Sequence, residues 1–383
     1  MGVRTSVLYV TPAGERGGAE VVLLNILRHL DRTRFDPMVV CLREGPLVRE
    51  LEDQTRLHVE VVPATRMRSV WNAARVIQRL RQVIRTRRID LVHCNGTSAH
   101  LYGGPAARLS GVPSIYHLHD VVEWSWSRQG QAHLLAVAVP STATIAVSDY
   151  VAKRFHESWW SRRVVHVIHN AINGRNSGDL KEAKRLYAEW GWSTGSLLAV
   201  WCGRLQRWKG THVFLQAAAI VKEQVPAAHF LVVGGGLFGM DASYEGRLHA
   251  LAKTLNLDGC LRFTGYQHDA QRFMEAADIV VHSSIHPDPF GLVILEGMAL
   301  GKPVIASGEG GPAEIVQPGV TGLLVPPGDP EALARAISQL LQDEALRAKM
   351  GKAGRARAET SFSVSRMMEN IENLYAELVR QQR

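Results

Sequence analysis

Apolar runs of strand length alternate with helix-length amphipathic segments along almost the whole chain. Seven such runs come first, at residues 5–10, 35–42, 58–63, 90–95, 113–119, 142–148 and 164–170. Six more follow, at residues 197–203, 229–236, 260–265, 278–284, 302–307 and 321–326. Continuous apolar strands separated by helices are typical of parallel sheets covered on both faces. The pattern predicts an α/β fold with two doubly wound, Rossmann-like domains.

A polar segment separates the two sets of strands. The sequence NAINGRNSGD at 170–179 interrupts the apolar pattern with asparagines and glycines, which are typical of a connecting loop. A chain of 383 residues is also long for a single core. We predict an N-terminal domain at 1–175 and a C-terminal domain at 176–361. The amphipathic end of the chain, 362–383, is expected to form a helix that packs back on the first domain.

The charge of the chain is unevenly divided between these domains. Residues 1–175 hold 23 Lys and Arg against 14 Asp and Glu, a net +9, and residues 176–383 hold 21 against 22, a net −1. The two sum to the +8 of the whole chain. An anionic partner should therefore meet the first domain. No recognised nucleic-acid-binding motif accompanies this charge, so we expect no nucleic-acid partner.

The sequence carries no signal for export or for a membrane span. No apolar run reaches the ~18 residues that cross a bilayer, and no secretory signal opens the chain. The four cysteines are widely separated and mostly lie in apolar runs, as is typical of buried thiols in a reducing compartment. We therefore expect a cytoplasmic protein.

Two cations and two glycines follow the first strand of the second set. Gly203 and Arg204 end the strand, and Lys209 and Gly210 open the next helix. Cations beside a helix N-terminus form an anion site that suits a diphosphate. The alternative interpretation is a pair of solvated surface charges, but the position at a strand end favours a phosphate contact.

Two acids flank an apolar stretch in PDPFGLVILEG (287–297). Asp288 should lie before a helix and Glu296 about 1.5 turns inside it, so the two are expected to bind different parts of an extended ligand. Each carboxylate suits a vicinal diol, and the backbone amides of Gly291 and Leu292 would face a phosphate. Asp288 could instead serve as a helix N-cap.

From Gly203 to Pro330 the sequence closely resembles the retaining GT-B glycosyltransferases of the family-4 type, the glycosyl transferases group 1. The matching stretches are GRLQRWKG (203–210), PFGLVILEGMALGKPVIAS (289–307), GGPAEIV (310–316) and GLLVPPGD (322–329). The resemblance extends over the whole chain through GERGGAE (14–20), HLHD (117–120), AVSDYV (146–151) and VIHNAIN (167–173).

The resemblance implies a transferase that moves a hexose-type sugar from a nucleotide-diphosphate sugar to a glycan or lipid-linked acceptor with retention of anomeric configuration. It implies two Rossmann-like domains that face a central cleft, the first binding the acceptor and the second the donor. The implied catalytic residues are Arg204, Lys209, His119 and Asp288. The implied donor-binding residues are Gly17, Gly18, Gly203, Arg204, Lys209, Phe290, Gly291, Leu292 and Glu296.

Within that set, the resemblance assigns the diphosphate to Arg204 and Lys209, the nucleotide ribose to Glu296, and the transferred sugar to Asp288. It places His119 beside the sugar. A core histidine at a strand end is the alternative interpretation of His119, and we expect His117 to point to the opposite face. Glu20 and Asp120 are weaker candidates.

One position departs from the family pattern. The first acid is usually Glu, and this chain has Asp288 at the same spacing. The shorter side chain puts the identity of the sugar in doubt. The sequence has no Asp-x-Asp motif, and the two cations could stabilise the leaving diphosphate, so we expect no metal and no cofactor. UDP and GDP donors both fit, and UDP is preferred on frequency.

The acceptor side is marked by a basic helical segment at 71–90. Its apolar positions have helical spacing, and six arginines occupy the remaining surface: Arg75, Arg79, Arg81, Arg85, Arg87 and Arg88. Such a helix can bind anionic lipid, or it can simply pack on a sheet with a solvated face. Together with Trp124, Trp126, Trp159 and Trp160, it suggests work at the inner membrane surface on a lipid-linked acceptor.

Three other functions use a similar scaffold. A nucleotide-sugar epimerase or a sugar phosphorylase would share the donor site, and a non-catalytic nucleotide-sugar-binding protein is compatible with the change at Asp288.

Overall fold

The computed structural model describes residues 4–12, 16–64, 70–122, 128–157, 164–172, 185, 188–193, 195–236 and 242–382. The chain divides into two compact units. The first comprises Met1–Ala171 together with Val364–Arg383, and the second is Ile172–Ser363. The chain first leaves unit 1 inside the predicted polar segment, four residues before the predicted end at 175, and it returns at Val364.

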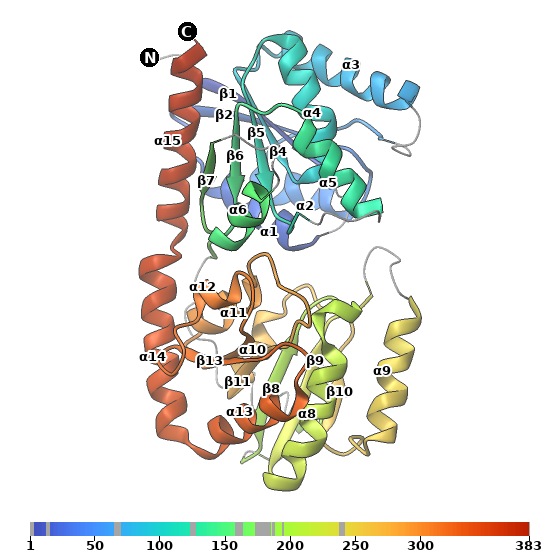
Figure 1. Ribbon diagram of the computed structural model, residues 1–383, viewed down its shortest axis with the longest axis vertical. Helices are drawn as coiled ribbons and strands as arrows, with labels where there is room; N and C mark the ends of the chain where they lie inside the picture. The colour runs from blue at the N-terminus through green and yellow to red at the C-terminus, as the bar shows by residue number, and fades with distance from the viewer. Residues whose placement is uncertain are drawn as a thin grey trace. The chain divides into compact units, whose positions relative to one another are not determined.

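The first unit contains a seven-stranded parallel sheet (Figure 1). Its strands are β1 (Thr5–Thr11), β2 (Phe35–Cys41), β3 (Val59–Val61), β4 (Leu91–Asn95), β5 (Ser114–Leu118), β6 (Ala143–Ala146) and β7 (Val165–Val167). The spatial order is β3-β2-β1-β4-β5-β6-β7. Residues in β4, β5 and β6 are buried throughout, as expected for strands covered on both faces.

Helices pack on this sheet in two groups. The helices are α1 (Gly18–His29), α2 (Pro46–Thr55), α3 (Val70–Thr86), α4 (Thr97–Ser110), α5 (Arg128–Ala138), α6 (Asp149–His156) and α15 (Val364–Gln382). In one group α4 contacts α3 and α5, and in the other α1 contacts α2 and α15. The C-terminal helix α15 therefore belongs to the first unit, where it buries Ile371, Leu374, Tyr375 and Leu378 on one face.

The second unit contains a six-stranded parallel sheet with the order β10-β9-β8-β11-β12-β13. Its strands are β8 (Leu197–Cys202), β9 (Ala228–Val233), β10 (Leu261–Phe263), β11 (Ile279–His282), β12 (Val304–Ser307) and β13 (Gly322–Val325). Its helices are η1 (Arg207–Lys209), α8 (Thr211–Gln224), α9 (Ala242–Thr254), α10 (Gln271–Ala276), α11 (Leu292–Ala299), α12 (Pro312–Ile315), α13 (Pro330–Gln342) and α14 (Glu344–Ser361).

The predicted strands and fold class are confirmed. Each predicted strand is present, with ends that differ by at most three residues. The strand order reverses between β1 and β4 in the first sheet and between β8 and β11 in the second. In doubly wound sheets, ligands bind beyond the carboxyl ends of strands at such reversals. The loops after β1, β4, β8 and β11 are therefore the places to look for a site.

Among the described residues, every helix is too short or too polar to pass through a lipid bilayer.

Candidate functional site

The loop after β8 packs closely against the end of β11 and is hydrogen-bonded to it. Gly210, between η1 and α8, has a φ of 69°, and a Cβ added there would lie 1.8 Å from the carbonyl oxygen of Ser283. The Ser283 hydroxyl donates to the Gly210 carbonyl oxygen at 2.9 Å and accepts from the Trp201 indole N–H at 3.0 Å. Only glycine allows this approach, so the sequence Lys209-Gly210 holds the lysine beside the next strand of the sheet.

The structure brings Lys209 and Asp288 together. The Lys209 Nζ lies 2.5 Å from Oδ2 of Asp288 and 4.1 Å from the centre of the Trp208 ring. The same carboxylate oxygen accepts from the His282 Nε2 at 3.0 Å. Burial by itself would raise the pKa of Asp288, which is 5% exposed, but the positive charge of Lys209 and the His282 hydrogen bond hold that pKa below its usual value. Asp288 is therefore an ionised, internally paired carboxylate.

Asp288 does not cap α11. Its second oxygen, Oδ1, accepts from the Phe290 backbone N–H at 3.2 Å, and the N-cap position is Gly291, whose φ is 92°. Gly311 donates its N–H to the Asp288 carbonyl oxygen at 2.9 Å, and a Cβ on Gly311 would lie 2.4 Å from the Phe290 Cα. The glycine turn at 308–311 therefore holds the PDPF loop by close packing.

Glu296 lies inside α11, four residues after its first residue, Leu292. It is partly buried, and its negative charge acts on the thiol of Cys202, the last residue of β8. Burial is the main reason that the pKa of the Cys202 thiol is raised, and the carboxylate of Glu296 adds to the rise. The structure thus places Glu296 near the strand end from which Gly203 and Arg204 continue. Both predicted acids and Lys209 lie at the carboxyl edge of the second sheet.

In the first unit, the glycine turn after β1 leads into α1. Gly17 is the N-cap of this helix, and Gly18 is its first residue. The Glu20 carboxylate accepts from the Gly17 N–H at 2.9 Å and is 6% exposed. Glu20, a weaker candidate in the sequence, thus has a helix-capping contact. Asp120 is exposed at the end of β5.

His119 lies just beyond β5 and contacts the end of β4. Its Nε2 lies 2.8 Å from Oδ1 of Asn95, and its ring centre lies 4.0 Å from that of His117. The expectation that His117 points to the opposite face is wrong, because residues two apart on a strand share a face. The ring of His119 keeps some exposed surface, but desolvation lowers its pKa to about 3, so it is neutral at physiological pH.

A buried column of side chains continues from His117 toward α15. The His117 Nδ1 lies 3.1 Å from the His93 Nε2, and the His93 Nδ1 lies 2.6 Å from the Tyr375 hydroxyl. That hydroxyl donates to the Tyr9 hydroxyl at 3.2 Å. Burial lowers the pKa of His93 to about 3 and lowers that of His117 as well. This column was not predicted, although histidines inside the apolar strands DLVHCN and PSIYHLH are a signal for it.

Two models of known families match the chain in succession. The model described as Glycosyltransferase Family 4 matches residues 16–174, and the model described as Glycosyl transferases group 1 matches residues 183–357. The chain belongs to the group 1 family of GT-B glycosyltransferases. The two matched ranges cover the second sheet, strands β2 to β7 of the first sheet, and the loops that carry Gly17, His119, Lys209 and Asp288.

Relatives and solved structures agree with this assignment. The chain is 26% identical over 377 residues to a UDP-Gal:alpha-D-GlcNAc-diphosphoundecaprenol alpha-1,3-galactosyltransferase of Escherichia coli, with 94% of each chain covered. It is 27% identical over 398 residues to a D-inositol 3-phosphate glycosyltransferase of Streptomyces avermitilis, covering 94% of this chain and 83% of the relative. A crystal structure of Anabaena HepE in complex with UDP-glucose superposes with a TM-score of 0.87 at 28% identity, covering 98% and 100%.

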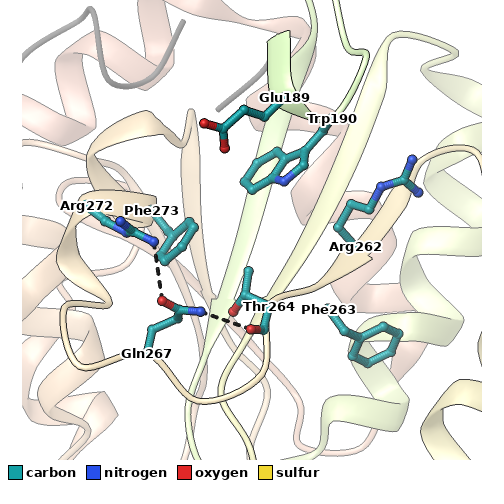
Figure 2. A pocket seen from close by; sticks show the side chains of 8 residues that line it. All are labelled: Glu189, Trp190, Arg262, Phe263, Thr264, Gln267, Arg272 and Phe273. Atoms are coloured by element: carbon teal, nitrogen blue, oxygen red, sulfur yellow. Dashed lines mark hydrogen bonds between the residues drawn. The ribbon is translucent and has the colours of Figure 1, made fainter. Parts of the chain in front are cut away.

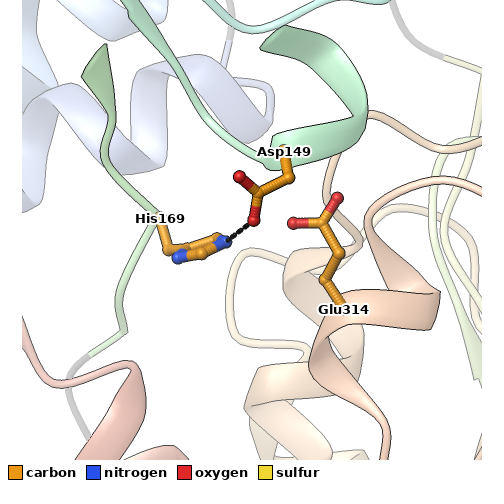
Figure 3. A group of neighbouring side chains, drawn as sticks. All are labelled: Asp149, His169 and Glu314. Carbon is orange, nitrogen blue, oxygen red and sulfur yellow. Dashed lines mark ion pairs between the residues drawn. The ribbon is translucent and has the colours of Figure 1, made fainter. Parts of the chain in front are cut away.

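Two motifs of this glycosyltransferase family meet in the first unit. Asp149 of AVSDYV opens α6, and His169 of VIHNAIN follows β7. The His169 Nε2 lies 3.9 Å from the Asp149 Oδ2 (Figure 3). Both side chains keep solvent contact, so the pair is a loose surface contact. The four tryptophans named in the membrane hypothesis, Trp124, Trp126, Trp159 and Trp160, lie outside the described residues.

A separate pocket of about 240 Å³ lies beside β10 (Figure 2). The rings of Trp190 and Phe273 line it nearly parallel, with centres 6.2 Å apart. Gln267 bridges its wall, donating to the Thr264 carbonyl oxygen at 3.0 Å and accepting from Arg272 at 3.3 Å. The lining contains none of the predicted site residues, so the pocket is distinct from the Lys209–Asp288 pair.

Proposed function

We propose that this glycosyltransferase transfers a hexose from a nucleotide-diphosphate sugar to a glycan or lipid-linked acceptor, with retention and without a metal ion. The observation that carries the proposal is the Lys209–Asp288 pair. A cation for the diphosphate and a carboxylate for the sugar lie 2.5 Å apart, at the ends of the two strands where the order of the second sheet reverses.

The diphosphate is assigned to Arg204 and Lys209. When the anomeric carbon separates from the phosphate oxygen, negative charge develops on the diphosphate, and preorganised cations and amides stabilise it. The N-terminus of α11, preceded by the left-handed Gly291, supplies further N–H donors for the phosphate. Lys209 would exchange its contact with Asp288 for the phosphate when the donor binds.

The two acids are assigned to hydroxyls. Asp288 accepts from hydroxyls of the transferred sugar, and Glu296 accepts from the ribose diol, because a carboxylate can accept two hydrogen bonds at once. In the proposed retaining step, the acceptor oxygen attacks the face of the sugar from which the diphosphate leaves. The bond from the anomeric carbon to the phosphate oxygen breaks, the bond to the acceptor oxygen forms, and the acceptor proton passes to the departing phosphate.

The proposed donor nucleotide is UDP. It is supported by Anabaena HepE, whose complex with UDP-glucose superposes on this chain over 98% of its length at 28% identity, and by the Escherichia coli relative whose name specifies UDP-Gal. A thermal-shift panel of UDP-, GDP- and ADP-sugars tests the assignment, because a donor raises the melting temperature in proportion to its occupancy. A shift with GDP-sugars alone would overturn the choice of UDP, and no shift with any sugar nucleotide would overturn the donor site.

Product analysis separates transfer from the competing functions. Incubation with donor alone yields an isomerised sugar nucleotide if the protein is an epimerase, whereas a transferase forms a new glycoside only with an acceptor. A phosphorylase would require inorganic phosphate. Saturable donor binding without transfer across many acceptors would instead identify a non-catalytic binding protein. Activity that is lost in EDTA and restored by Mn²⁺ or Mg²⁺ would contradict metal independence.

The acceptor is proposed to be lipid-linked and reached at an anionic membrane surface on the cytoplasmic side. The observations behind this second proposal are exposed apolar side chains on α3 and α5 and exposed arginines on and just after α3. Trp71 on α3 is 84% exposed and Leu135 on α5 is 60% exposed. Five arginines of the 71–90 segment are also exposed: Arg75, Arg79, Arg85, Arg87 and Arg88. Exposed apolar side chains beside cations are typical of helices that lie on anionic bilayers.

A liposome sedimentation assay tests the membrane proposal. The protein should sediment with vesicles containing anionic lipid at low salt and remain in the supernatant with neutral vesicles. Replacing Trp71 and Leu135 by Ser should weaken the binding, whereas replacing the exposed Val320 of the second unit should not. Absence of sedimentation with anionic vesicles at low salt would rule the proposal out.

A further inference from the structure

Asn95 ends β4 and is fully buried next to His119. Its amide Nδ2 lies 3.4 Å from the Ala19 carbonyl oxygen and 3.4 Å from the Thr11 hydroxyl. A carbonyl oxygen can only accept a hydrogen bond, so Nδ2 must face it and Oδ1 must face His119. The orientation of the Asn95 amide therefore follows from its neighbours.

The orientation of Asn95 determines which nitrogen of His119 carries the proton. Oδ1 can only accept, and it lies 2.8 Å from the His119 Nε2, so Nε2 must donate. The pKa of His119 is lowered to about 3 by desolvation, so the ring is neutral and holds a single N–H. The other nitrogen, Nδ1, consequently presents a lone pair. Among the residues that the structure describes, Nδ1 has no hydrogen-bond partner.

His117 restricts the ring further. The two ring centres are 4.0 Å apart with planes inclined by 33°, so one face of His119 is covered by another buried ring. With Nε2 bound and one face covered, the ring can neither rotate freely nor exchange tautomers without losing a buried hydrogen bond.

We propose that Asn95 is a positioning residue that holds His119 in the Nε2–H tautomer, so that Nδ1 accepts a hydrogen bond from a hydroxyl of the sugar substrate. The ligand half of this inference rests on the proposed function, and the tautomer half does not. A neutral acceptor with a fixed direction orients a hydroxyl without transferring a proton to it. His119 therefore orients the sugar and does not act as a general acid.

Nitrogen-15 NMR of the full-length protein, labelled at histidine, tests the tautomer directly. In alkaline buffer the wild type should show a protonated Nε2 and a bare Nδ1 at His119, identified by its loss in His119→Ala. Asn95→Leu removes the acceptor and should shift the ring toward the Nδ1–H form. Asn95→Asp retains an acceptor and should keep the wild-type pattern. A wild-type ring in the Nδ1–H form, or an unchanged pattern in Asn95→Leu, would overturn the proposal.

The matched control is Thr97→Val. Thr97 is buried two residues away and shares a hydrogen bond of 2.8 Å with the Tyr116 hydroxyl, and among the described residues no hydrogen bond joins it to His119. Thr97→Val should lose one buried hydrogen bond while the His119 tautomer stays unchanged. This variant separates a general loosening of the sheet edge from the specific effect of Asn95.

Kinetics test the ligand half of the inference. Asn95→Leu should lower kcat/KM for the sugar donor roughly tenfold, the effect of one misdirected hydrogen bond. Asn95→Asp should recover part of the loss, because it keeps the acceptor that faces Nε2 but sets its second oxygen against the Ala19 carbonyl oxygen. Thr97→Val should stay near the wild-type value. Equal losses in Asn95→Leu and Thr97→Val would reduce Asn95 to a structural role. If the wild type transfers no sugar at all, the proposed function fails while the NMR result still decides the tautomer.

Discussion

Lys209 and Asp288 are separated by 79 residues in the sequence, yet the lysine Nζ lies 2.5 Å from the aspartate Oδ2. Each comes from the loop after a different strand of the second sheet, and β8 and β11 are neighbours in that sheet. The contact leaves the buried carboxylate ionised and holds the lysine in place. A substrate that binds here meets both groups already positioned.

Lys209→Ala should lower turnover by about 10²-fold or more, because it removes a cation that stabilises the negative charge developing on the diphosphate. It should also lower the free energy of unfolding by about 2 kcal/mol. This is less than the ~3–5 kcal/mol for breaking a fully buried pair, because Lys209 keeps some solvent contact. Steady-state kinetics and urea unfolding measure the two effects.

The double variant Lys209→Ala/Asp288→Asn serves as the control for that experiment. It should regain part of the lost stability, because no uncompensated buried charge remains, but it should regain no activity. Recovery of turnover in the double variant would show that Lys209 acts only as the counter-ion of Asp288.

Asp288→Glu restores the acid that the family usually has and moves the carboxylate by about one carbon–carbon bond, ~1.5 Å. We expect the ratio of kcat/KM values between UDP-glucose and other UDP-hexoses to change by about tenfold, since hydroxyl geometry decides such preferences. UDP affinity, measured by calorimetry, should stay within about twofold, because the nucleotide contacts are unaltered. Equal changes for every sugar would remove Asp288 from sugar recognition.

Gly210→Ala should lower stability and donor affinity together. The added Cβ would lie 1.8 Å from the Ser283 carbonyl oxygen, so the loop carrying Lys209 must move away from β11. The matched control is Gly301→Ala, where φ is similar at 70° but the Cβ meets open space. The control should lose only the roughly 1–2 kcal/mol of a left-handed alanine, and Gly210→Ala clearly more. Similar losses in both would show that the close approach is unimportant.

The stability of the fold should fall as the pH drops from about 6.5 toward 3. Unfolded histidine titrates near pH 6.5, whereas burial lowers the pKa of His93 and of His119 to about 3. The unfolded chain therefore binds more protons than the folded chain in this pH window. The free energy of unfolding consequently rises with pH and reaches its maximum contribution from these histidines above about pH 6.5. Urea unfolding across this range should show the slope.

His93→Gln should flatten that pH dependence, and His156→Gln, at an exposed position on α6, should leave it unchanged. A steeper slope in His93→Gln would contradict the neutral, buried state of His93.

Below about pH 4 a further loss of stability is expected. In the folded protein the pKa of Asp288 is below the usual value for an aspartate. The ionised carboxylate therefore stabilises the fold at pH values above the usual pKa, and this stabilisation is lost as acid protonates it.

Much of the site could be predicted at the level of loops. Each predicted motif follows a strand, and because the carboxyl ends of parallel strands lie at one edge, the loops after β8 and β11 bring Lys209 and Asp288 together. The capping contact of Glu20 was not predicted, and the predicted orientation of His117 was wrong. Glu20 looks like any acid beside a glycine turn until its contact with the Gly17 N–H is seen, and the face of His117 was misjudged.

By itself, the sequence determined the strands, the helices and the family, because those depend on local apolar periodicity and on short motifs that read along the chain. Only the tertiary structure decided the partners. Tyr375 reaches His93 across 282 residues, and Asn95 reaches His119 across 24, through the adjacency of β4 and β5 and the return of α15. Such pairings arise from strand order and helix docking, which place distant residues at hydrogen-bond distance without leaving a local pattern in the sequence.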